Sequence, residues 1–239
     1  SDKTNGFICR PRKNVFRNIV NKSNLSLISV RQVAEGIFNH VFITPFISEC
    51  RVMLSNKGYG YSFPLYLYPT EQKQDLFEHS KWPEGKSGRV PNLDKGFVEE
   101  FAGQVGLEFV SEGRGDLRNT FGPEDLFDYI YAVFHSPDYR EKYAEFLKID
   151  FPRVPWAEDN GRFAKLVKIG DEFKKLHLME AEVLEDDRRW PVFGVEGERR
   201  VEKGYPKFIK KEDEPGRVYI NGEQYFAGVE PRVWEYHIG

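Results

Sequence analysis

The sequence predicts an α+β fold, with mixed or antiparallel strands at both ends of the chain around a central block of about four helices. Short β-prone runs fill the first third, and apolar residues then recur at helical spacing to about residue 176. Strand patterns return near the end of the chain. We therefore expect β-rich regions over residues 1–90 and 186–239 and a helical region over 91–185, with the terminal strands able to share one sheet around the helical insert.

The expected strands of the first third are rich in β-branched and aromatic residues. They cover residues 25–30, 41–44, 51–54 and 66–68. Turn residues in 56–60 (NKGYG) predict a loop, and the polar stretch 70–88 predicts a surface connection.

Helix signals begin at Asp94, a good N-cap, and the first helix is expected to stop at Gly106. Pro123 and Pro137 suit the first positions of the next two helices, because proline already has the helical φ angle. Ser136 is the expected N-cap of the second of these. The segment 121–156 therefore predicts a packed helical hairpin.

A fourth helix is expected to open at Asn160. Gly170 lies in its interior, where glycine costs about 1 kcal/mol relative to alanine, so we expect close packing at that position. Beyond this helix, Asn221-Gly222 separates two short β-prone runs and predicts a hairpin.

Composition excludes several classes of protein. The chain has 239 residues, of which 40% are hydrophobic, and no apolar run approaches the roughly 20 residues that span a bilayer. The polar, basic N-terminus is not a secretory signal. Cys9 and Cys50 do not make a disulfide framework, which favours reduced thiols and a cytoplasmic location. Because the chain begins without Met and ends within an ordered pattern, we expect a piece excised from a larger protein.

Charge is unevenly distributed although the net charge is only −3. Residues 1–31 hold seven Lys or Arg side chains against Asp2 alone, and residues 199–211 hold six against Glu202. A phosphate backbone responds to local potential, so these clusters are candidates for nucleic-acid contact. Two solvated surface patches are the alternative interpretation.

Signatures of catalysis are missing from the sequence, including GxGxxG after a strand, GxxxxGK[ST], GxSxG and HExxH. The histidines and cysteines show no metal-ligand spacing. Asp138, Glu172 and Lys174 only loosely match a nuclease cluster, because they lack a two-metal arrangement. We therefore name no catalytic residue and no metal ligand, and a metal-dependent nuclease or hydrolase domain remains an alternative.

Residue types suited to DNA contact occur at several expected loops and strand ends. Arg31 and Gln32 end a strand with side chains that can read guanine and adenine edges. Lys57 and Tyr59 combine phosphate contact with stacking, as does the neighbouring Tyr61. For each of them the alternative is an exposed side chain with a structural partner.

Further candidates follow in the second half of the chain. The glycine-rich loop 111–122 contains Arg114, Arg118 and Asn119. Arg153 lies in a stiff turn between Pro152 and Val154, where an ion pair to a helix end is the alternative role. Lys207 and Lys210 belong to the basic cluster 199–211.

Long segments of the chain resemble one family, both in their amino-acid sequence and in the order in which they occur. The main run is GPEDLFDYIYAVFHSPDYREKYAEFLKIDFPRVP, and the others are NLSLISVRQ, FPLYLYP, GDEFKKLHLME and RVYINGEQYFAGVEPRVWEYHIG. They resemble the specificity region of type ISP restriction-modification enzymes and related adenine-specific DNA methyltransferases. The resemblance covers the chain from about residue 24 to its end.

This resemblance implies that residues 1–239 form the C-terminal target recognition domain of a larger enzyme. Its partners would be double-stranded DNA and the methyltransferase core of the same polypeptide. No association with a membrane is expected. The fragment would bind no cofactor, whereas the parent enzyme would use S-adenosylmethionine, ATP and Mg²⁺. The resemblance does not assign the residues that read bases. A scaffold that docks the methyltransferase core without binding DNA is a further alternative.

Overall fold

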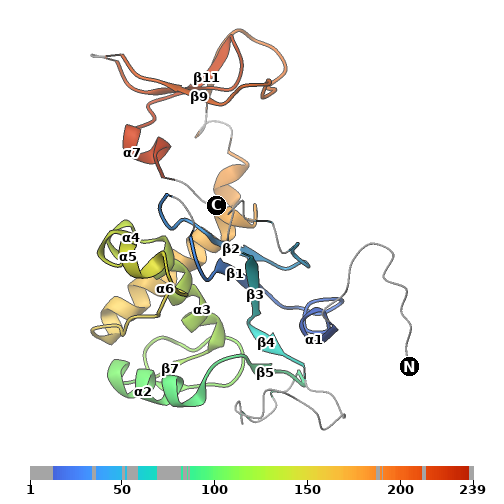
Figure 1. The fold of residues 1–239 in the computed structure, drawn as a ribbon, viewed down its shortest axis with the longest axis vertical. Coiled ribbons are helices and arrows are strands. Elements are labelled where there is room, and N and C mark those ends of the chain that lie inside the picture. Colours follow the sequence, from blue (N-terminus) through green and yellow to red (C-terminus); the bar gives the residue numbers. More distant parts are fainter. Residues whose placement is uncertain are drawn as a thin grey trace. The chain divides into compact units, whose positions relative to one another are not determined.

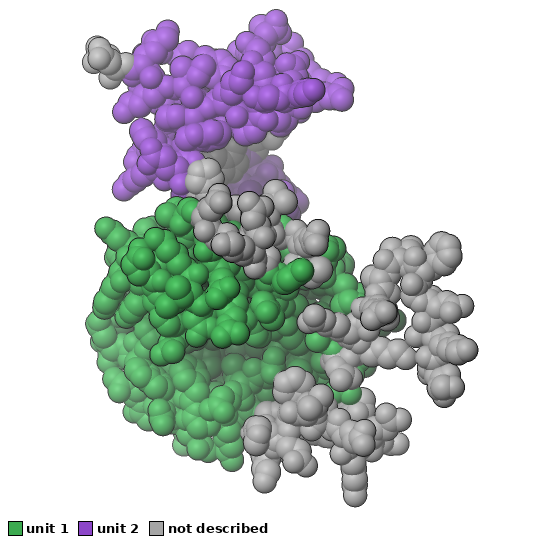
Figure 2. All heavy atoms as spheres, viewed as in Figure 1, with its two compact units in different colours: residues 1–178, 239 green, residues 179–238 purple. Residues whose placement is uncertain are grey.

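The computed structural model describes two compact units of the chain, coloured separately in Figure 2. The first unit extends to Leu178 and the second runs from Met179 to Ile238. The residues that the structure describes are 13–33, 36–49, 52, 59–68, 82, 85, 87–186, 189, 191–211 and 214–236.

The first unit consists of short strands followed by helices, with one short helix before the first strand and another helix between two of the later strands (Figure 1). Its first elements are α1 (Lys13–Phe16), β1 (Ser26–Val30), β2 (Val41–Thr44), β3 (Gly60–Pro64), β4 (Tyr66–Leu67) and β5 (Val90–Pro91). They are followed by α2 (Lys95–Val105), β6 (Glu108–Phe109), β7 (Thr120–Phe121), α3 (Pro123–His135), α4 (Pro137–Lys142), α5 (Ala144–Leu147) and α6 (Asn160–His177).

An antiparallel sheet of order β2-β1-β3 lies in this unit, with β1 in the centre. Ile28 and Val30 of β1 are buried in the hydrophobic core of the unit. The short pairs β4–β5 (antiparallel) and β6–β7 (parallel) complete the strands of the unit. Strand β3 begins inside the segment that the sequence predicts to be a loop. The expected strand 51–54 lies outside the described residues apart from Val52.

Helix boundaries follow the predicted caps. The Asp94 side chain accepts a hydrogen bond from the Phe97 amide at 2.8 Å, and Gly106 ends α2 in the left-handed region at φ 70°. Pro123 and Pro137 open α3 and α4. Helix α6 begins at Asn160, as expected, and the side chain of the preceding residue, Asp159, caps it.

The core of the first unit forms around α3, which lies against α6 (Figure 1). Phe101 of α2, Tyr129 of α3 and Phe163 of α6 are all buried, with ring centroids 5.2–5.4 Å apart. Gly170 lies where the two helices approach closely, because a Cβ placed there would lie 1.9 Å from the Asp128 carbonyl oxygen. The prediction of close packing at Gly170 is confirmed.

The second unit contains the 3-10 turn η1 (Glu182–Leu184) and an antiparallel sheet of order β8-β11-β10-β9. Its strands are β8 (Val192–Gly194), β9 (Lys207–Ile209), β10 (Arg217–Tyr219) and β11 (Gln224–Ala227), and helix α7 (Pro231–Trp234) follows. The β10–β11 hairpin turns at the predicted Asn-Gly pair. Asn221 fixes the turn by accepting hydrogen bonds from the amides of Glu223 (3.0 Å) and Gln224 (2.7 Å).

The predicted α+β class is confirmed, whereas the expectation of one sheet shared by the two ends of the chain is wrong for the described strands. Each end pairs its strands within its own sheet, β2-β1-β3 in the first unit and β8-β11-β10-β9 in the second. No helix among the described residues is long and apolar enough to cross a membrane.

Candidate nucleic-acid interface

Arg31 and Tyr59 lie at the same end of the β1–β3 ladder. Val30 pairs with Gly60 in the antiparallel register, and Arg31 and Tyr59 are the next residues of the two strands. The Arg31 Nε atom lies 3.2 Å from the Asp150 Oδ1 atom, yet the arginine side chain remains 60% exposed. Tyr59 is 57% exposed. This ladder end therefore presents a guanidinium and an aromatic ring to solvent.

The turn 149–153 brings two more predicted residues to the same place. Gln32 donates from Nε2 to the Ile149 carbonyl oxygen at 3.5 Å. Arg153 is exposed, with its guanidinium carbon 4.9 Å from the centroid of the Phe146 ring. The pKa of Asp150 is lowered by the Phe151 amide and by the charges of Arg31 and Arg153. We call Arg31, Gln32, Tyr59 and Arg153 the ladder-end cluster.

Aromatic side chains continue this surface along β3. Tyr61 and Phe63 are partly exposed and meet the Phe151 ring edge-on, at centroid distances of 5.0 and 5.6 Å. Exposed rings beside cations suit stacking on bases and contact with thymine methyl groups. Lys57, predicted to act with Tyr59, lies outside the described residues.

Arg114 lies away from this cluster, at the foot of loop 111–122. Its guanidinium pairs with Glu124 (3.7 Å), Asp125 (3.1 Å), Asp171 (2.9 Å) and Asp128. Asp125 and Asp128 have side chains that are 1% and 0% exposed, so Arg114 neutralises charges inside the protein. These ion pairs give Arg114 a structural role. A DNA contact by Arg114 stays a prediction.

Arg118 and Asn119 are exposed near the tip of the same loop. The last two candidates belong to the second unit. Lys207 is an exposed residue of β9, with its Nζ atom 4.7 Å from the Tyr205 ring centroid, and Lys210 is exposed just after that strand. The structure therefore gathers four candidates in the ladder-end cluster, and the other described candidates belong to loop 111–122 or to strand β9 and the residues just after it.

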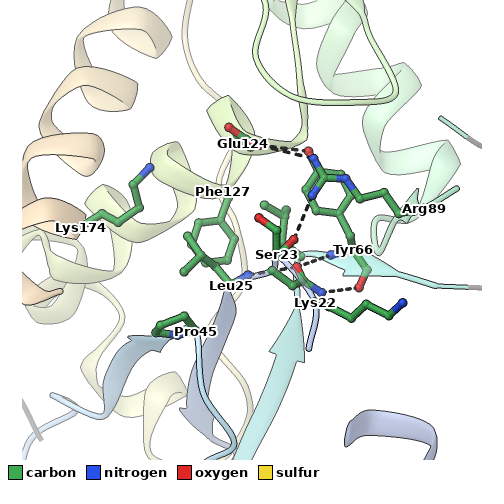
Figure 3. A pocket seen from close by; sticks show the side chains of 11 residues that line it. Lys22, Ser23, Leu25, Pro45, Tyr66, Arg89, Glu124, Phe127 and Lys174 are labelled. Atoms are coloured by element: carbon green, nitrogen blue, oxygen red, sulfur yellow. Dashed lines mark hydrogen bonds and ion pairs between the residues drawn. The ribbon is translucent and has the colours of Figure 1, made fainter. Parts of the chain in front are cut away.

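A cavity of about 300 Å³ adjoins the foot of the loop (Figure 3). Its lining includes Lys22, Tyr66, Arg89, Glu124 and Lys174. Figure 3 shows Tyr66 and Arg89 reaching toward Glu124, and the Arg89 guanidinium stacks 3.8 Å from the Tyr66 ring centroid. Burial raises the pKa of Tyr66 to about 12, so its hydroxyl remains protonated and donates to Glu124 at 3.4 Å.

The sequence did not indicate this cavity, although Lys22 belongs to the basic cluster 1–31 and Lys174 to the loose nuclease arrangement. Tyr66 belongs to an expected strand and Arg89 directly follows the expected polar connection 70–88, and neither pattern indicates a cavity. Among the residues that the structure describes, no three His, Cys, Asp or Glu side chains are arranged to hold a metal ion.

A family model described as the Type ISP C-terminal specificity domain matches residues 2–239. The chain belongs to this family. A search of curated proteins found no match.

Two solved structures share the fold of this specificity domain. One is the cryoEM structure of a DrdV–DNA complex, with a TM-score of 0.56 and 22% identity over 90% of this chain. The other is the ATP-dependent Type ISP restriction-modification enzyme LlaBIII bound to DNA, with a TM-score of 0.54 and 20% identity over 91% of this chain. The chain covers only 19% and 12%, respectively, of the two solved chains.

Proposed function

We propose that this specificity domain recognises a sequence in double-stranded DNA and positions the duplex for N6-adenine methylation and restriction by other domains of the same enzyme. The observation that carries the proposal is the family match over residues 2–239. The two solved proteins of similar fold are both complexes with DNA, which supports it.

The geometry of the ladder-end cluster is suited to this role. Arg31 uses Nε toward Asp150, so the two terminal nitrogens of its guanidinium are available for a bidentate contact with guanine. Tyr59 and Arg153 border this group with a ring and a second cation. Because β1, β3 and the turn 149–153 hold the backbone, little conformational freedom is lost when DNA binds.

This assignment implies roles for the other domains of the enzyme. The domain would dock against the methyltransferase core of its own polypeptide. S-adenosylmethionine, ATP and Mg²⁺ would be bound by other domains, and the enzyme would act in the cytoplasm. The residues of this chain would select the site at which that chemistry takes place.

A selection experiment with the full-length protein tests the proposal. Duplexes from a randomised library are selected by binding, and the affinity for the enriched duplex is compared with the affinity for scrambled duplexes. Enrichment of one sequence is expected. Failure to prefer any duplex would refute the proposal, and Mg²⁺-dependent cleavage by the chain alone would favour the nuclease alternative.

Arg31→Ala locates the interface, and Arg162→Ala is its matched control. Arg162 is also an exposed arginine that pairs with a carboxylate, since its NH1 atom lies 3.1 Å from Glu158. Loss of a bidentate base contact at Arg31 should weaken specific binding about 5- to 150-fold. Arg162→Ala should leave the affinity unchanged. Equal effects of the two substitutions would remove Arg31 from the interface.

A further inference from the structure

Loop 111–122 is held to the helices by a buried carboxylate. Asp125 lies in the first turn of α3, and its Oδ2 atom accepts hydrogen bonds from the amides of Gly115 (2.6 Å) and Gly122 (2.9 Å). Its Oδ1 atom pairs with Arg114 at 3.1 Å. One side chain thus fixes both ends of the segment 115–122.

Arg114 extends this attachment from α3 to α6. It pairs with Asp128 of α3 and Asp171 of α6, and Lys174 also bridges these two carboxylates at 2.7 and 3.0 Å. A Cβ on Gly115 would lie only 2.2 Å from the Thr120 carbonyl oxygen, so the loop folds tightly on itself. The foot of the loop is therefore part of the rigid core.

The tip of the loop is organised by Asp116. Its Oδ1 atom accepts hydrogen bonds from the amides of Arg118 (2.9 Å), Asn119 (2.7 Å) and Thr120 (2.9 Å). The Leu117 amide also donates to the Thr120 carbonyl oxygen at 2.9 Å, which closes the turn. Three amides lower the pKa of Asp116, so it is ionised throughout the neutral pH range.

These contacts use the backbone donors of the tip and leave two side chains to meet a ligand. Arg118 is exposed, and its guanidinium forms no ion pair with any residue in the described part of the chain. Asn119 donates from Nδ2 to the Asp116 Oδ2 atom at 3.2 Å. A carboxylate only accepts hydrogen bonds, so the amide nitrogen must face Asp116 and the amide oxygen faces away from it.

We propose that Arg118 and Asn119 form a pre-organised tip that reads a G·C base pair in the major groove, with Asp116 and Arg114 as the residues that position it. Guanine presents two acceptors, N7 and O6, which match the two donors of a guanidinium. The paired cytosine presents the N4 amino group, which matches the free amide oxygen. This inference rests on the proposed function and specifies which part of the domain reads one base pair.

The test uses the full-length protein and the enriched duplex, with each base pair replaced in turn. Arg118→Ala should abolish the preference for G·C at one position, a loss of about 5- to 150-fold, and leave preferences elsewhere intact. Arg118→Lys keeps the charge and can still donate to guanine, so it should keep the salt dependence of binding and retain more of the preference at that position than Arg118→Ala does. Arg162→Ala again serves as the control.

Substitutions of Asp116 test its positioning role. Asp116→Ala should lower the preference at the same position as Arg118→Ala, and the double variant should lose no more than Arg118→Ala alone. Asp116→Asn keeps an oxygen that accepts the backbone amides but replaces the oxygen that holds the Asn119 amide, so it should restore the part of the preference that depends on Arg118 and not the part that depends on Asn119. Thermal unfolding of each variant shows whether the fold is intact.

Other outcomes would overturn the inference. If Arg118→Ala weakens binding to every duplex equally and reduces the salt slope by about one unit, Arg118 contacts a phosphate and not a base. If it leaves the preferences unchanged, the tip does not touch DNA. In both cases the proposed function stands, because it fails only if the unaltered protein shows no sequence preference.

Discussion

Gly170→Ala should destabilise the first unit although alanine is the better helix former. The added Cβ would lie 1.9 Å from the Asp128 carbonyl oxygen and 2.6 Å from its carbon, whereas ordinary contacts exceed about 3.4 Å. Helices α3 and α6 would have to separate by roughly 1.5 Å at a buried point. Overpacking of this kind costs about 1–3 kcal/mol, or more where backbone must move, against a gain of about 1 kcal/mol in helix propensity.

We expect a net loss of about 2 kcal/mol in the free energy of unfolding, which corresponds to a fall of roughly 4–8 °C in Tm for a unit of this size. Urea and thermal unfolding measure both values. Gly103→Ala is the matched control, because Gly103 lies in α2, is exposed and has no atom within 4 Å of an added Cβ. It should stabilise by about 0.5–1 kcal/mol. A Gly170→Ala variant as stable as the unaltered protein would refute the reasoning.

Two other predictions concern pH and the second unit. Burial, with the charges of Arg140 and His177, lowers the pKa of His135 from 6.5 to about 3. Its neutral form is therefore favoured in the fold, and its stabilising contribution is complete above pH 6.5 and is lost as pH falls toward 3, at up to about 1.4 kcal/mol per pH unit. Urea unfolding at several pH values between 7 and 5 gives the free energy of unfolding as a function of pH. This free energy should change less steeply with pH in His135→Gln than in the unaltered protein, and equal steepness would contradict the assignment. Asn221→Ala removes the hydrogen bonds to Gln224 and should destabilise the β10–β11 hairpin by about 1–3 kcal/mol. Faster amide exchange is expected in that hairpin, with unchanged unfolding of the first unit, and unchanged exchange would refute the role of Asn221.

The helix boundaries could be predicted because their signals are local. Asp94 caps a helix through an amide three residues away, and Gly106 ends it through its own φ angle. Asn221-Gly222 likewise forms a turn between adjacent strands. In each case the partners lie within a few residues, so the sequence contains the whole interaction.

The sequence did not predict strand β3, because its partner is distant in the chain. It did not predict the pair β6–β7, because these strands are too short. Strand β3 pairs with β1, more than 30 residues earlier in the chain. Strands β6 and β7 have two residues each, which is too few to show a period of two. The ladder-end cluster depends on the same long-range pairing, so the sequence suggested its members one by one but not their proximity.

Arg114 and Arg118 show why residue type alone does not identify a DNA contact. They lie in one loop, four residues apart, and the sequence gives both the same candidate role. For Arg114 to bind a phosphate, it would have to leave the buried carboxylates of Asp125 and Asp128. Asp128 would keep Lys174, but Asp125 would keep only its two backbone amides in the described part of the chain. Removal of one partner from a buried ion pair costs about 3–5 kcal/mol, more than a surface phosphate contact returns. Arg118 gives up no such partner among the described residues, while Asp116 already holds its backbone in place. The ion pairs that keep Arg114 in the protein interior also fix the foot of the loop. Arg118, at the tip of this fixed loop, is therefore the better candidate for a DNA contact.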